Sequence, residues 1–250
     1  MSWPDYALLL AAGVAAGVCG TVTGIGSVFS YPALLATGLP ALSANVTNTL
    51  SLALGFPGGI YSSRPELGGQ ASRAWRLALA CALGSALGAA LLLISPPGIF
   101  EKVVPFLVAA ASAAILLPRP HPTESQRVEQ SRLQRRTLLA TVAVSIYNGY
   151  FAAAGGVLII AVLLATTSWS FRHINALKNV LIVASDVAAA IAYASFGPVS
   201  WPALPPLVIG LLLGAWLGPA IARRLPPDKL RYGIALAGLA LGIKLGLDAY

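Results

Sequence analysis

The sequence predicts an all-α integral membrane protein built from two inverted-topology repeats of about five apolar segments each. Three observations predict this fold class. Hydrophobic residues make up 57% of the chain and charged residues 10%, whereas a soluble domain carries roughly 25% charged residues. Apolar segments recur along nearly the whole length, and basic residues cluster in particular turns between them. Short sequence motifs also recur between the two halves.

We predict ten apolar segments. They cover residues 5–22, 25–42, 45–62, 74–95, 99–117, 137–152, 155–167, 174–195, 202–222 and 230–247. The first lacks a basic flank before its apolar run, so we expect a retained helix and not a cleaved signal peptide. Segments 137–152 and 155–167 are shorter than the roughly 20 residues of a spanning helix, which is compatible with a re-entrant hairpin. Whether 25–42 spans the bilayer fully stays open.

A charged stretch separates the two repeats. Residues 1–117 form the first transmembrane repeat, 118–136 a cytoplasmic linker and 137–250 the second transmembrane repeat. The linker carries five arginines, and basic residues close to the membrane mark the cytoplasmic side. We count membrane crossings in both directions from the linker. Every basic turn then falls on the cytoplasmic side, and the uncharged turns SPPG and SFGPVS fall on the external side. Corresponding turns of the two halves then lie on opposite faces, so the repeats are inverted.

The two halves also share sequence. LGSALGAAL at 83–91 matches LGAWLGPAI at 213–221, and LLAT occurs at 34–37 and again at 163–166. Repeats with odd numbers of crossings and opposite orientation are a recurring plan of secondary transporters.

A glycine cluster precedes LLAT in each half, TGIGS at 23–27 and AAAGGV at 152–157. Glycine lets the backbone leave a helix, and the helix N-terminus that follows can hold an oxyanion. We therefore predict that Gly26, Gly155 and Gly156 contribute to a substrate site, with close helix packing as the alternative. Packing alone is expected for five glycines at four-residue spacing, Gly84, Gly88, Gly210, Gly214 and Gly218.

Paired amides follow the glycine clusters at equivalent positions. Amides donate and accept hydrogen bonds, so they can replace part of a hydration shell without burying a full charge. The predicted substrate-binding residues are Asn45, Thr47, Asn48, Asn175, Lys178 and Asn179. We expect Asn48 and Asn179 to approach each other near the membrane midplane. The alternatives are interhelical hydrogen bonds for the amides and, for Lys178, an extension toward the cytoplasm.

Asp186 is the only acidic residue deep inside an apolar segment. A carboxylate in hydrocarbon is costly unless it is paired, neutral or facing water, so Asp186 is a candidate for proton coupling. The alternative is a structural partner for a cation such as Lys178.

Several function classes are disfavoured. The chain has no H-E-x-x-H, Walker A or C-x-x-C motif, so we expect no enzyme, no cofactor and no metal site. Cys19 and Cys81 lie in apolar segments and predict no disulfide framework. The net charge of +8 resides at segment ends and in the linker, which indicates membrane orientation and not nucleic-acid binding.

These motifs together resemble the TauE/SafE sulfite-exporter family. The resemblance rests on NVTNTL in the first half and on YNGYFAAAGGVLII, NALKNVLIVASD and LGAWLGPAIARRLP in the second. It implies a multi-pass permease of two pseudo-symmetric halves that moves sulfite, sulfonates or related small anions. The chain has Thr49 where the family often has Lys, and Asp186 where the family often has Asn.

We therefore expect a secondary transporter of the inner (cytoplasmic) membrane that moves a small anion, sulfite or an organosulfonate, by alternating access. The expected partners are that anion and the lipid bilayer, and the sequence does not distinguish a monomer from a homodimer. Two alternatives stay open, a permease for a cation or neutral metabolite and a membrane scaffold without transport activity.

Overall fold

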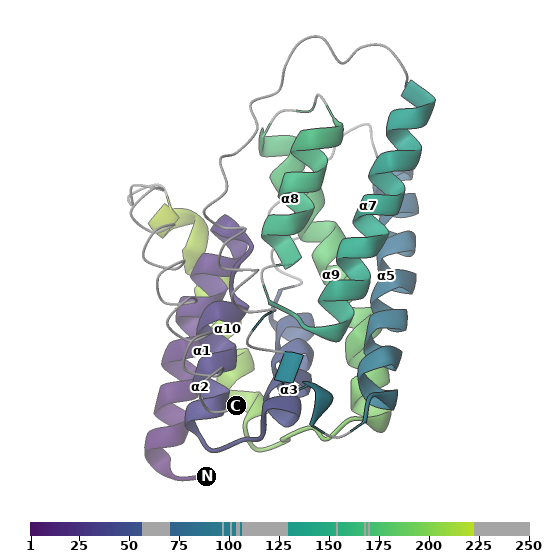
Figure 1. Ribbon diagram of the computed structural model, residues 1–250. Helices are drawn as coiled ribbons and strands as arrows, with labels where there is room; N and C mark the ends of the chain where they lie inside the picture. Colours follow the sequence, from purple (N-terminus) through teal and green to yellow (C-terminus); the bar gives the residue numbers. More distant parts are fainter. Residues whose placement is uncertain are drawn as a thin grey trace.

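The computed structural model describes residues 1–56, 71–96, 98–100, 102, 103, 106, 130–153, 155–167, 169 and 171–222. Within these ranges α-helices are the regular elements and no strand occurs. The helices are α1 (Trp3–Thr23), α2 (Ser27–Ala36), α3 (Ala41–Gly55), α5 (Ala71–Ile94), α7 (Gln130–Tyr150), α8 (Gly155–Thr166), α9 (Phe171–Phe196) and α10 (Leu204–Ala222) (Figure 1). The all-helical prediction is confirmed for the described residues. Segment 230–247, most of 99–117 and linker residues 118–129 lie outside them.

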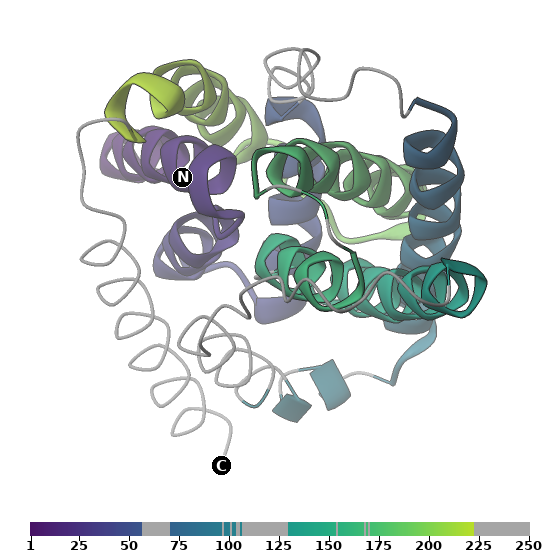
Figure 2. The same cartoon turned by 90° about the horizontal axis from the view of Figure 1, so that it is seen from above.

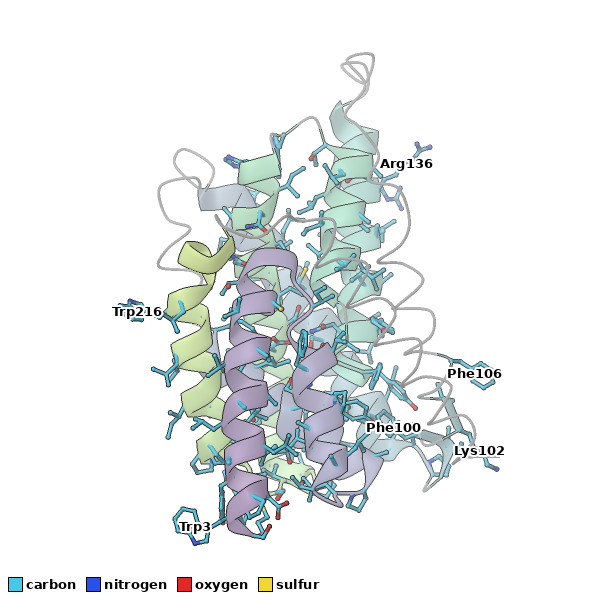
Figure 3. All side chains as sticks on the ribbon, turned by 90° about the vertical axis from the view of Figure 1, so that its left-hand side faces the viewer. Trp3, Phe100, Lys102, Phe106, Arg136 and Trp216 are labelled. Carbon is cyan, nitrogen blue, oxygen red and sulfur yellow. The ribbon has the colours of Figure 1, made fainter. Side chains whose placement is uncertain are left out.

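The surface of the helix bundle is apolar. Trp3–Thr21, Ala74–Ile94 and His173–Phe196 are long and apolar enough to cross a membrane. Large side chains point outward from these helices and from α10, including Leu83, Ile191 and Trp216, which is 80% exposed (Figure 3). Soluble proteins rarely expose so much contiguous apolar surface. The chain is a membrane protein whose outer helix faces contact lipid.

Two of the helices are short. The 10 residues of α2 and the 12 residues of α8 give lengths of about 15 and 18 Å, roughly half of the ~30 Å hydrocarbon core. In Figure 1, α8 lies in the upper half of the bundle and α2 in the lower half.

The helix that contains the predicted segment 137–152 begins before that segment does. Helix α7 begins at Gln130 and has 21 residues, about 32 Å, but it is not among the described helices that are both long and apolar enough to cross a membrane. Glutamine and arginine are good helix formers, so the helix continues through polar residues that an apolar segment cannot include. Residues 130–136, expected as the end of a linker loop, are therefore the first turns of α7, and Arg135 and Arg136 remain exposed.

The main contacts join helices from different halves of the chain. α1 packs along α10, α5 packs along α7, and α3 and α9 meet between these pairs (Figure 2). Glycines line both outer contacts. A Cβ at Gly13 would lie 2.9 Å from the Gly210 Cα, and a Cβ at Gly84 would lie 2.9 Å from the Val142 carbonyl oxygen. Such distances leave no room for a side chain.

The packing role predicted for Gly84, Gly88, Gly210 and Gly214 is confirmed, because backbone of the facing helix lies against each of them. Gly218 belongs to α10, but its surroundings are outside what the structure describes.

Candidate functional site

A pocket lies where α1, α2, α3, α7, α8 and α9 meet. It opens to solvent, and the space between its lining atoms is about 500 Å³ when the solvent at its mouth is counted. Its walls come from both halves of the chain, as expected for a site shared between two repeats. The lining residues are Gly20, Thr21, Gly24, Gly26, Ser27, Leu52, Phe56, Asn148, Ala152, Gly155, Gly156, Lys178, Asn179, Ile182, Val183 and Asp186.

Both short helices begin at this pocket. Helix α1 ends at Thr23 and is capped by Gly24, whose φ of +80° lies in the left-handed region that favours glycine, and α2 starts at Ser27. Helix α8 starts at Gly155, after the turn that follows α7. The N-terminus of a helix carries a positive partial charge, although at the start of α2 the Val28 and Phe29 N–H groups already donate to the Ile25 and Gly26 carbonyls. Two helix N-termini therefore contribute to the pocket wall.

The two chain breaks lie directly against each other. A Cβ at Gly156 would lie 2.7 Å from the Gly24 carbonyl oxygen, and a Cβ at Gly24 would lie 3.0 Å from the Gly156 Cα. A side chain at either position would push the backbones apart. The glycine clusters of the two halves thus meet at one point although about 130 residues separate them in sequence.

The break between α7 and α8 is held by α3 and α2. The Asn45 side chain donates from Nδ2 to the Tyr150 carbonyl at 3.1 Å and accepts at Oδ1 from the Ala152 N–H at 3.4 Å. The Phe151 ring lies edge-on to the Tyr31 ring of α2, with 5.4 Å between centroids. Asn45 therefore positions the turn that carries part of the pocket wall.

Lys178 brings a cation into the pocket. Its side chain is 1% exposed, and its Nζ donates to the Gly20 carbonyl at a long 3.4 Å. The stem passes Gly24, where an added Cβ would lie 3.3 Å from the lysine Cδ. A buried ammonium held by one long hydrogen bond keeps donors available for an anionic ligand.

Asp186 lies further along α9 and is also 1% exposed. Its Oδ1 accepts from the Asn148 Nδ2 at 2.8 Å. Asp186 and Lys178 are eight residues apart, about 12 Å along the helix axis, and in the described part of the chain no ion pair joins them. The pocket therefore has a lysine at one end and an aspartate at the other.

The pocket includes six of the sequence-predicted site residues, which are Gly26, Gly155, Gly156, Lys178, Asn179 and Asp186. Asn45, Thr47, Asn48 and Asn175 are not among its lining residues. The Thr47 Oγ1 accepts from the Ser200 N–H at 2.9 Å, and the Asn48 Oδ1 accepts from the Ser30 hydroxyl at 2.5 Å. The Asn175 Oδ1 is buried with no hydrogen-bond partner in the described residues.

Sequence reasoning missed Asn148, the hydrogen-bond partner of Asp186. Asn148 also packs against Gly155 at a place where a Cβ would clash with its amide. The internal repeat gave no signal, because the positions 129 and 130 residues earlier, the offsets of the repeated motifs, are Cys19 and Val18. The available signal was a lone amide in the otherwise apolar segment 137–152.

We expect Asn48→Ala to lower the free energy of unfolding by about 1–3 kcal/mol, because the buried Ser30 hydroxyl loses its acceptor. Asn179→Ala removes a pocket residue, so it should instead weaken anion binding. Thermal unfolding and equilibrium binding of both purified variants separate the two effects. If Asn48→Ala weakened binding as much as Asn179→Ala and left stability intact, Asn48 would belong to the ligand site.

Comparison with known proteins gives a consistent identity. The sequence model of the sulfite exporter TauE/SafE family matches residues 9–245. A "Probable membrane transporter protein" of Haemophilus influenzae is 25% identical, over 97% of this chain and 94% of the relative. The "Probable membrane transporter protein ORF9" of a Sinorhizobium species is also 25% identical, over 97% and 92% of the two chains.

A third relative, the "Probable membrane transporter protein YfcA" of Escherichia coli K12, is 23% identical over 94% of this chain and 87% of its own. No solved structure matches the chain significantly. With a family match that spans almost the full length, the chain belongs to the sulfite exporter TauE/SafE family.

Proposed function

We propose that this protein is a multi-pass secondary transporter of the inner membrane, and not an enzyme, that moves a small anion, sulfite or an organosulfonate. One observation carries the proposal. The buried Lys178 ammonium and the starts of α2 and α8 line the same pocket. Helix N-termini and a desolvated cation both stabilise negative charge, and a site assembled this way suits an oxyanion.

The proposed mechanism is alternating access of two inverted repeats. If α1, α2, α3 and α5 correspond to α7, α8, α9 and α10, the larger helix contacts obey that exchange, whereas the smaller α7–α9 contact has no comparable α1–α3 counterpart. α1 packs on α10 as α7 packs on α5, α1 on α2 as α7 on α8, and α3 on α10 as α9 on α5. The α3–α9 contact maps onto itself. This pattern supports a pseudo-two-fold relation through the pocket, the arrangement from which many transporters operate.

A binding screen on purified protein tests the anion assignment. Thermal unfolding is measured with sulfite, sulfate, thiosulfate, taurine and sulfoacetate, because a ligand that binds the folded state must stabilise it. We expect at least one sulfur anion to raise the unfolding temperature in a concentration-dependent way. If the sodium or potassium salt of every anion raised the unfolding temperature equally, the cation would be the ligand. That result would favour a cation permease, the second candidate function, which the buried Asp186 supports.

Asp186 is the proposed proton-coupling residue. It is the acidic residue of the pocket, it is buried, and Lys178 is the other ionisable side chain in the lining. We expect Asp186→Asn to fold and to remove the pH dependence of transport, measured as flux into proteoliposomes at fixed anion gradient between pH 5 and 8. A pH profile identical to that of the parent protein would exclude the coupling role.

In the proposed orientation the first turn of α7 lies on the cytoplasmic side of the membrane, and the turn after α9 lies on the external side. Figure 3 shows Arg136 at the opposite end of the bundle from Trp3. We expect Trp201→Cys to react with an impermeant maleimide in intact cells and Arg136→Cys to react only after permeabilisation. The two native cysteines are buried, which keeps the background low. The reverse labelling pattern would invert the topology.

A further inference from the structure

The two ends of the pocket point to a ligand with two functional ends. We infer that the site takes a small organic anion that carries an N–H or O–H donor on the side away from its anionic group. This inference rests on the proposed function, which assigns the anionic group to Lys178 and the helix N-termini. It adds a chemical requirement for the rest of the ligand.

The aspartate end of the pocket has an unused acceptor. Asp186 lines the pocket and is 1% exposed, and the Asn148 amide donates to one of its two oxygens. In the described part of the chain Asp186 makes no other hydrogen bond. A carboxylate accepts several hydrogen bonds, and leaving it buried without donors is unfavourable. A ligand donor at this position would complete its shell.

Apolar side chains form part of the wall between Lys178 and Asp186, where Asn179 is the polar residue of α9. Ile182 lies four residues after Lys178 and four before Asp186 on α9, and all three side chains line the pocket. Leu52 and Phe56 also contribute to the lining. Apolar side chains between two polar ends match a ligand with methylene groups between an anionic head and a donor.

The spacing also argues against a bare oxyanion as the best ligand. The backbone positions of Lys178 and Asp186 are about 12 Å apart along α9. A bare oxyanion at the lysine end would leave the aspartate end unfilled. An anion with no donor that reached Asp186 would leave its second oxygen without a hydrogen-bond partner and, while the side chain is ionised, would meet a like charge, which opposes binding in a low-dielectric site.

Three ethanesulfonates of equal chain length test this requirement. Taurine carries an ammonium donor at its far end, isethionate a hydroxyl donor, and ethanesulfonate no donor. Dissociation constants are measured by calorimetry on the purified full-length protein. We expect taurine and isethionate to bind at least tenfold more tightly than ethanesulfonate. The difference between the first two shows whether the donor must also be cationic.

Substitutions in the pocket test which residue distinguishes taurine from ethanesulfonate. In Asp186→Asn the preference for taurine over ethanesulfonate should fall to within about twofold. Asn148→Ala, which removes the hydrogen bond that orients the carboxylate, should lower the same ratio and provides a second variant if the first folds poorly. Asp5→Asn makes the same chemical change at an exposed carboxylate that bonds Ser2, so it should keep the parental ratio.

The outcomes separate this inference from the proposed function. Equal affinity for the three sulfonates, or binding of sulfite but of none of them, would overturn the donor requirement and leave an anion transporter. A tenfold preference that survives in both Asp186→Asn and Asn148→Ala would also overturn it, because the donor would be recognised elsewhere. Failure of every sulfur anion in the binding screen would overturn the proposed function itself.

Discussion

Lys178→Met is expected to reduce anion affinity by a factor of about 30 or more and to abolish transport. Methionine keeps much of the stem volume but removes the ammonium, which is the cation among the described pocket residues. Truncating one partner of a buried charge interaction costs about 2–5 kcal/mol of binding free energy. Flux in proteoliposomes and calorimetric titration with the best anion from the screen measure the effect.

Stability gives this prediction a second readout. In the described structure the Lys178 ammonium makes one long hydrogen bond and has no carboxylate partner, so its burial is costly in the unliganded protein. Lys178→Met should therefore unfold at the same temperature as the parent or higher. Lys102→Met, a matched change far from the pocket at the Trp3 end of the bundle (Figure 3), should leave affinity within about twofold. A Lys178 variant that unfolds easily and still binds would make the lysine structural.

Gly24→Ala should lower both the stability of the protein and its affinity for the anion. The left-handed backbone costs a non-glycine residue about 1–2 kcal/mol, and the new methyl group would lie 3.0 Å from the Gly156 backbone. Overpacking of this kind costs a further ~1–3 kcal/mol. We expect a lower unfolding temperature and weaker anion binding, because both helix starts move when the breaks separate.

Gly38→Ala is the matched control for this substitution. Gly38 has φ +83°, nearly the value at Gly24, but a Cβ there would meet nothing within 4 Å. It should show the backbone cost alone and bind anions like the parent. Equal losses of stability and affinity in the two variants would mean that the contact between the breaks is unimportant.

Part of the site could be predicted from sequence because its chemistry is unusual for an apolar chain. Lys178 and Asp186 stand out as charges within apolar segments, and the glycine clusters stand out by their repetition in both halves. All of them line the pocket or border it. Composition alone also predicted the helical class, since a backbone in lipid must satisfy its own hydrogen bonds.

The roles of the amides could not be predicted in the same way. Asn45 and Asn48 share one helix face, but their partners belong to other segments, the Tyr150–Ala152 turn and Ser30. Spacing within a helix identifies which side chains point together and not which segment lies opposite them. Asn148 was missed for the same reason, because its importance comes from Asp186 on another helix.

The contacts of α1 with α10 and of α5 with α7 have a consequence for how the chain assembles. The glycine-lined face of each outer helix is complementary to a helix encoded on the other side of the linker. A chain severed between α5 and α7 would yield two fragments that each display an unsatisfied contact face, and each could reach its native arrangement only by docking on the other. During synthesis the helices of the first half therefore cannot complete their packing until those of the second half enter the bilayer.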